Sequence, residues 1–421
     1  MTRAKSVAAK AWGLAVGLAF AQSPAMAGGY DSGERDWDAL FITSQTVAVE
    51  TQVRHLVPDR DLSNVAASDT AISGNLLAST TGTTTAPEAE AFTIFRASAI
   101  GRAGEHLRCM ASFRQPWEGH ANYGTGFIAS AAAIDQHFSS QDYGLTCAGT
   151  HHLDTGQVSL VGGVSYQHAR YELTQSVLNT GVAPPFPVIG VATTDVDDWS
   201  WAWRVGLAYE IPAYALRASL IYNSQVDFDM KGTFSSVPGT AVIQGSISMP
   251  QSLELEVQSG VAPSWLAFGS IRWTDWSVAT AMPLVNAQTI PGAFLGVGGT
   301  LAPGTAQLSG LQLQWNDSWT ATAGGVHQLN DQLSLTGSLT WDQGATNGFT
   351  SQTDTWVGAF NAVYNPTEQA QIVVGGSAGL MTSGSVSTQT RHSGAANPLG
   401  YTATYGNDWV FGLNASLKVS F

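Results

Sequence analysis

The chain contains few charged residues for its length. Asp, Glu, Lys and Arg make up 11% of its 421 residues, compared with roughly 25% in soluble globular domains. Hydrophobic residues nevertheless reach 44%, which is not the composition of a disordered chain. The formal net charge is −14, and an acidic surface is a poor match for nucleic acid. We therefore expect no nucleic-acid partner.

Long apolar runs are also missing. Beyond the N-terminus no stretch reaches the ~18 consecutive apolar residues of a membrane-spanning helix. At the N-terminus, three basic residues precede an apolar run over 12–21, and Ala25-Met26-Ala27 offers a small-residue cleavage site. Residues 1–27 are therefore predicted to form a secretory signal peptide, and the mature protein is predicted to meet an oxidising compartment.

Sites for metals, cofactors and catalysis are not visible in the sequence. The two cysteines, Cys109 and Cys147, lack the spacing of redox or zinc motifs. His151 and His152 are adjacent, so on a strand they would point to opposite faces. No combination of Ser and His suggests a hydrolase. We expect no cofactor, no catalytic residue and no enzymatic activity.

The last 13 residues show a strict alternation. Every second residue from Trp409 to Phe421 is apolar, and the intervening positions include Asn414, Ser416 and Lys418. This pattern is typical of a strand between lipid and a water-filled lumen. A terminal aromatic residue is typical of bacterial outer-membrane barrels. We expect Phe421 to engage the outer-membrane assembly machinery, and the barrel surface to contact outer-membrane lipid and lipopolysaccharide.

The lengths of the connectors between predicted strands support the same fold along the whole chain. Six connectors between predicted strands are tight and the other seven are longer, in strict alternation. Short periplasmic turns and long outer loops alternate in this way in an up-and-down barrel. The sequence therefore predicts an all-β, 14-stranded antiparallel transmembrane barrel over 45–421. The predicted strands are 45–57, 89–101, 105–115, 141–151, 156–171, 198–211, 213–228, 249–261, 264–279, 308–328, 330–343, 353–364, 369–382 and 404–421.

The two cysteines fall on the third and fourth predicted strands. If Phe113 pairs with Tyr143, Cys109 lies opposite Cys147. Antiparallel neighbours are ~4.5–5.5 Å apart at Cα, which suits a disulfide. A cross-strand disulfide and a pair of small lipid-facing residues both remain open.

A barrel of 14 strands is too wide to be filled by its own wall side chains. Residues 28–44 precede the first strand and combine Trp37, Leu40 and Phe41 with several charged residues. These residues are predicted to form a short N-terminal plug, or hatch; a disordered terminus is the alternative.

Four basic residues have the parity of lumen-facing positions: Arg204, Arg217, Arg272 and Lys418. Each is a candidate to hold an anionic head group through charge-assisted hydrogen bonds. Pairing with carboxylates of the wall, or with the plug, is the alternative for each of them.

The predicted outer loops are partly apolar. They include 188–191, 282–285 and 293–297, and residues 127–133 are predicted to form a short helix. Exposed apolar loops suit the capture of a hydrophobic ligand. Packing of these loops on one another explains the same composition.

Several segments resemble the FadL-type (OMPP1/FadL/TodX) family of outer-membrane long-chain fatty acid transporters. They are residues 92–102 and 107–117, residues 143–147, residues 207–220 and, most specifically, Pro250-Gln251-Ser252-Leu253 followed by residues 265–277 with Trp273, Trp276 and Ser277. The resemblance implies a monomeric, plugged 14-stranded barrel. It also implies sideways release of the cargo through a gap beside a kinked third strand, which here ends at Gln115-Pro116.

The preferred prediction is therefore passive, ligand-gated uptake of fatty acids or similar hydrophobic small molecules. The alternative is a porin for small polar solutes. A third hypothesis is an outer-membrane enzyme or adhesin that uses the barrel only as a support.

Overall fold

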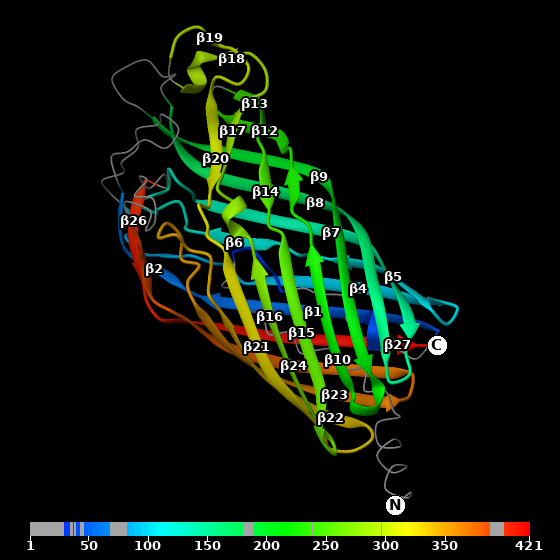
Figure 1. Ribbon diagram of the computed structural model, residues 1–421. Helices are drawn as coiled ribbons and strands as arrows, with labels where there is room; N and C mark the ends of the chain where they lie inside the picture. Colours follow the sequence, from blue (N-terminus) through cyan, green and yellow to red (C-terminus); the bar gives the residue numbers. More distant parts are fainter. Residues whose placement is uncertain are drawn as a thin grey trace, which may run out of the picture.

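The computed structural model describes residues 29–33, 37, 39–42, 46–67, 82–179, 188–237, 239–295, 297–387 and 400–421. The predicted signal peptide lies outside these residues. Fourteen antiparallel strands form a closed barrel (Figure 1), in which the first strand pairs with both the second and the last. The predicted fold class is thus confirmed.

The barrel strands follow the chain in order. They are β1 (Val47–Asp59), β4 (Phe92–Ala103), β5 (Leu107–Arg114) continued by β6 (Glu118–Asn122), β7 (Asp135–His152), β8 (Gln157–Asn179), β9 (Val188–Ile211), β10 (Leu216–Asn223), β15 (Ser252–Ala262), β16 (Trp265–Thr274), β21 (Ser318–Gln328), β22 (Leu333–Asp342), β23 (Thr355–Thr367), β24 (Ala370–Met381) and β27 (Asp408–Ser420).

The lipid-facing and lumen-facing sides alternate as the sequence predicted. On β9, Trp201 is 68% exposed while its neighbours Ala202 and Arg204 are buried. On β27, Leu413 is 67% exposed and Lys418 is buried. No helix among the described residues is long and apolar enough to cross a membrane.

Strands β8 and β9 are longer than predicted, with 23 and 24 residues. Residues 188–191 were predicted to lie in an outer loop, but they form the start of β9. The alternation of buried and exposed side chains continues into the outer end of β9, since Ala192, Thr194 and Val196 are all buried. The extended strands raise the barrel wall on the side of the long loops.

The long loops also add strands to this raised wall. The hairpin of β12 (Lys231–Ser236) and β13 (Gly239–Gln244) pairs with β9 and with β17 (Ala281–Asn286), which pairs with β20 (Gln307–Gln312). Residues 282–285 are therefore strand rather than loop. The remaining elements are β2 (Asp61–Ala67), β3 (Ala86–Pro87), β11 (Val226–Phe228), β14 (Ile247–Met249), β18 (Ile290–Pro291), β19 (Thr300–Leu301), β25 (Gly384–Val386), β26 (Tyr401–Tyr405), α2 (Ala39–Ile42), and the single turns η1 (Pro212–Tyr214), η2 (Trp276–Val278) and η3 (Gly292–Leu295).

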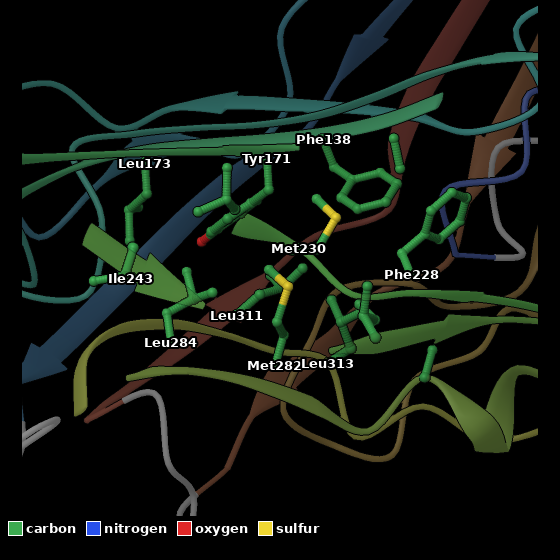
Figure 2. Close-up of a cluster of buried hydrophobic side chains, with 14 of the residues drawn as sticks. Phe138, Tyr171, Leu173, Phe228, Met230, Ile243, Met282, Leu284, Leu311 and Leu313 are labelled. Atoms are coloured by element: carbon green, nitrogen blue, oxygen red, sulfur yellow. The ribbon is translucent and has the colours of Figure 1, made fainter. Parts of the chain in front are cut away.

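Apolar residues of these added strands form a core inside the outer half of the barrel. Figure 2 shows Met282 and Leu284 of β17 facing Tyr171 of β8 and Met230, and all four are fully buried. The outer loops thus pack on one another and on the wall. This observation accounts for much of their apolar composition.

The predicted helix over 127–133 is not formed. Its residues make successive turns, with the amides of Ser130 and Ala132 donating to the carbonyls three residues earlier. An isolated β-bridge pairs Phe127 with Thr83, and this pairing holds the segment where a helix would otherwise continue. Cys109 and Cys147 lie opposite each other on β5 and β7 and are joined by a disulfide.

Candidate functional site

The wall of the barrel is interrupted at its third strand. The ladder between β4 and β5 ends at the pair Ala97–Phe113, and Gln115–Trp117 separate β5 from β6. Pro116 has no amide hydrogen to donate to a ladder. The side chain of Gln115 reaches across the interruption, and its Oε1 accepts from the Phe95 amide at 2.7 Å. The backbone ladder is therefore interrupted between β4 and β6, where the family resemblance implies a side gap.

An N-terminal segment pairs with the chain at this interruption from inside the barrel. The Ser32 amide donates to the Pro116 carbonyl at 2.9 Å, and the Glu118 amide donates to the Tyr30 carbonyl at 2.9 Å. Asp31 forms an ion pair with Arg272 of β16. Residues 30–32, which we call the latch, thus act as a short extra strand held from both sides.

Five aromatic rings around the latch contact one another inside the barrel. Tyr30 stacks on Phe138 with centroids 5.1 Å apart and meets the edge of Trp315 at 5.0 Å. Trp276 contacts both Trp315 and Trp117. Trp276 comes from the most family-specific sequence segment and is fully buried. We call these five residues the aromatic partition.

Two cavities border the partition, one lined by Tyr30 and Trp315 and the other by Trp117. Along β8, Gln167 lines one and Gln175, nearer the long loops, lines the other. We name them the lower cavity, of about 40 Å³, and the upper cavity, of about 160 Å³. A cavity of ~150 Å³ holds a benzene molecule. The upper cavity therefore has room for one aromatic ring, while the lower one has room for little more than water.

The lower cavity contains two of the predicted basic residues. It is lined by Arg204, Arg272 and Arg114. Arg114 Nη2 lies 2.6 Å from Asp142 Oδ2, and Arg204 Nη2 lies 3.9 Å from the same oxygen. This cavity thus brings together three guanidinium groups and the carboxylates of Asp31 and Asp142.

The three predicted plug residues are buried inside the barrel below the latch. Trp37 and Leu40 are 2% and 1% exposed, and Phe41 is 8% exposed. They pack against small and apolar wall residues of β1, β4, β5, β7, β8, β9 and β10. The Arg204 guanidinium lies 5.6 Å from the centre of the Trp37 ring, and that of Arg217 lies 5.5 Å from Phe41. Such distances suit cation–π interactions.

The fourth predicted basic residue lies apart from the other three. Lys418 of β27 pairs in register with Glu50 of β1, and Glu50 forms an ion pair with Arg96 of β4 at 2.6 Å. Lys418 is buried against the lumen side of this wall. The structure thus brings Arg204 and Arg272 together, seats Arg217 under the plug, and places Lys418 in the β1–β27 wall.

The upper cavity is lined by residues that the sequence pattern did not single out as ligand contacts. They include Tyr30, Arg60, Glu88, Glu90, Glu118, Gln136, Gln175, Gln312, Trp315 and Tyr401. Arg60 and Glu88 come from irregular segments, where alternation gives no signal. Arg114 of the lower cavity has the same parity as Arg204 and could have been selected by that rule.

Two charged side chains of the upper cavity, those of Arg60 and Glu88, are held by other groups of the protein. Arg60 is 4% exposed and donates to the Thr353 hydroxyl at 3.1 Å and the Thr382 carbonyl at 2.9 Å. Its Nε lies 3.3 Å from Asp408 Oδ2. Ser351 donates a hydrogen bond to Glu88. Burial raises the pKa of the Glu88 carboxyl, although Arg60 acts in the opposite direction.

Comparison with known proteins identifies the family. The family model described as "Outer membrane protein transport protein (OMPP1/FadL/TodX)" matches residues 7–419. The chain belongs to this family. It is therefore a β-barrel protein of the Gram-negative outer membrane.

Individual relatives are distant in sequence. A long-chain fatty acid transport protein of Salmonella typhi is 29% identical over 104 residues, which are 21% of this chain and 24% of that protein. The corresponding Escherichia coli (strain K12) protein is 28% identical over 104 residues, or 21% of this chain and 23% of its own. The chain thus matches about a quarter of the length of these relatives.

Solved structures share the fold over nearly the whole chain. A Pseudomonas aeruginosa FadL homologue has a TM-score of 0.74 at 13% identity, covering 97% of this chain and 98% of that one. The Ralstonia pickettii toluene transporter TbuX has a TM-score of 0.60 at 12% identity, covering 95% and 97%. At these identities the likeness supports the fold alone.

Proposed function

We propose that the protein takes up long-chain fatty acids or similar hydrophobic compounds by passive diffusion, with release sideways through the gap between β4 and β6. The observation that carries this proposal is the latch. It pairs with the chain at the interruption between β5 and β6, and its Tyr30 belongs to the aromatic partition that borders both cavities. A single movement of residues 30–32 would open both the passage between the cavities and the side exit.

Ligand gating follows from the position of Tyr30. Its ring forms part of the floor of the upper cavity and part of the aromatic partition. A compound that fills the upper cavity would compete for the contacts of this ring. Gly119 faces Tyr30 so closely that a methyl group at that position would overlap the ring. The latch is therefore sensitive to small changes of volume here.

The predicted basic residues take a later role in this scheme. Arg272 is engaged by the latch, and Arg204 and Arg217 lie under Trp37 and Phe41. We propose that they contact an anionic head group after the N-terminal segment moves, with Lys418 contributing from the opposite wall. Residues 1–27 as signal peptide, 28–44 as plug and 45–421 as barrel complete the proposal.

We further infer a monomer that acts without catalysis, contacts outer-membrane lipid and lipopolysaccharide, and is assembled through recognition of Phe421. Phe421 is 71% exposed at the end of β27.

The experiment that tests the function is uptake of radiolabelled fatty acid and of an aromatic hydrocarbon by a deletion strain with and without the gene. We expect slower uptake in the deletion strain and recovery on complementation. Unchanged uptake, together with a large ion conductance of the purified protein in planar bilayers, would replace this proposal with the porin alternative.

A further inference from the structure

The lining of the upper cavity offers amide groups to a ligand. Gln175 on β8 is only 6% exposed, and Gln312 of β20 lines the same cavity. Among the described residues, none forms a hydrogen bond with the side-chain amide of Gln175 or Gln312. A carboxamide both donates and accepts hydrogen bonds. A buried amide without a protein partner favours a ligand that supplies one.

The same lining is unfavourable for an anion. The described residues that line it include one guanidinium, that of Arg60, and three carboxyl groups, those of Glu88, Glu90 and Glu118. The Arg60 guanidinium is already used by Thr353, Thr382 and Asp408, and it lies 4.8 Å from the centre of the Tyr405 ring. The other basic side chain of the lining, His120, lies 3.3 Å from Asp135. A ligand carboxylate placed here would therefore meet three carboxyl groups at low dielectric, and each basic group nearby already has a carboxylate partner.

We propose that the upper cavity binds an uncharged compound, about the size of one aromatic ring or ending in one, that carries a hydrogen-bonding group such as a carboxamide. A compound of the same size that carries a carboxylate instead binds less tightly. The volume of about 160 Å³ sets the ring size, and Gln175 and Gln312 recognise the polar group. This inference rests on the proposed transport of hydrophobic compounds and specifies which of them the resting protein selects.

The test compares three ligands of one size: benzamide, benzoate and toluene. Equilibrium dialysis of each radiolabelled compound against the full-length protein in detergent gives its affinity at about pH 8, where benzoate is ionised. We expect benzamide to bind roughly tenfold more tightly than benzoate. Toluene is expected to bind between the two, because it fills the cavity without either the hydrogen bonds or the charge.

Two substitutions assign the preference to named groups. Gln175→Leu should weaken benzamide about fivefold, the effect of one net hydrogen bond, and leave toluene unchanged. Glu88→Gln should strengthen benzoate severalfold and leave benzamide unchanged, because the amide oxygen still accepts from Ser351. Gln332→Leu makes the same chemical change as Gln175→Leu on the exposed β21–β22 turn and serves as the matched control.

The outcomes separate this inference from the general function. Equal affinity for benzamide and benzoate, or loss of toluene together with benzamide in Gln175→Leu, overturns the inference while leaving hydrophobic transport intact. Absence of binding for all three compounds, with no uptake of fatty acids or hydrocarbons by cells, overturns the proposed function instead. Retention of the folded band on unheated gels shows that each variant forms its barrel.

Discussion

The two cavities that border the aromatic partition differ in charge as well as in size. The upper cavity presents amides and carboxyl groups around a guanidinium that is already paired. The lower cavity presents Arg114, Arg204 and Arg272 beside Asp31 and Asp142. Only the lower one depends on the N-terminal segment for its charge balance. In the proposed mechanism, a ligand is selected in the upper cavity, and the charge of its head group becomes relevant only in the lower one.

Deleting residues 28–44 should have the largest effect, because it removes both the latch and the proposed plug. A wall of 14 strands without a filled interior leaves a water-filled lumen, so we expect single-channel conductance to rise by about an order of magnitude. Conductance in planar bilayers measures it. The signal-peptide cleavage site is retained, and heat-modifiable migration verifies the folded barrel. Conductance equal to that of the intact protein would show that other residues close the lumen.

Replacing Trp37 with Ala should have the next largest effect. Its side chain is 2% exposed and lies over the Arg204 guanidinium, so the change leaves a hole beside a buried charge. We expect about 4 kcal/mol of lost unfolding free energy. Trp356→Ala on the lipid-facing side of β23, where the residue is 48% exposed, is the control and should cost clearly less. Denaturant unfolding in detergent measures both, and equal losses would contradict a plug role.

Breaking the ion pair of the latch should have the third largest effect. Asp31→Ala leaves Arg272 without its carboxylate partner, and loss of one member of a buried pair costs about 3 kcal/mol. The double variant Asp31→Ala/Arg272→Ala should recover part of this loss. The exposed pair Arg170–Asp195 at 2.7 Å provides the matched cycle, with an expected coupling of roughly 0–1 kcal/mol. Similar coupling in both cycles would mean that the latch is not held by this pair.

The barrel could be predicted from the sequence because its signal is repeated in every strand. Alternation placed Arg204 and Lys418 in the lumen, and the tight turns fixed the strand count. The same rule failed for residues 188–191. This short apolar segment is predicted to lie in a loop, but it forms the first residues of β9.

The upper cavity could not be predicted in this way. Arg60 and Glu88 lie in irregular segments, and Gln175 lies on the part of β8 beyond its predicted end. Likewise, nothing local in the sequence shows that Trp37 covers Arg204 or that Asp31 meets Arg272. Those contacts join residues more than 160 positions apart, and they depend on how the N-terminal segment enters the barrel.

The smallest expected effect concerns the predicted head-group contacts of the lower cavity. Arg217→Glu should weaken binding of a long-chain fatty acid about fivefold, because its charge acts on the head group only in the fraction of molecules whose N-terminal segment has moved. Arg204→Gln, which removes the charge without placing a second carboxylate beside Asp142, should act in the same direction. Arg170→Glu on the outer surface is the charge-matched control. Equilibrium dialysis of radiolabelled fatty acid and of the matching alcohol measures the effect. If fatty acid and alcohol weaken equally in Arg217→Glu, the change acts through the plug rather than on the head group, and the difference in charge between the cavities has no role in transport.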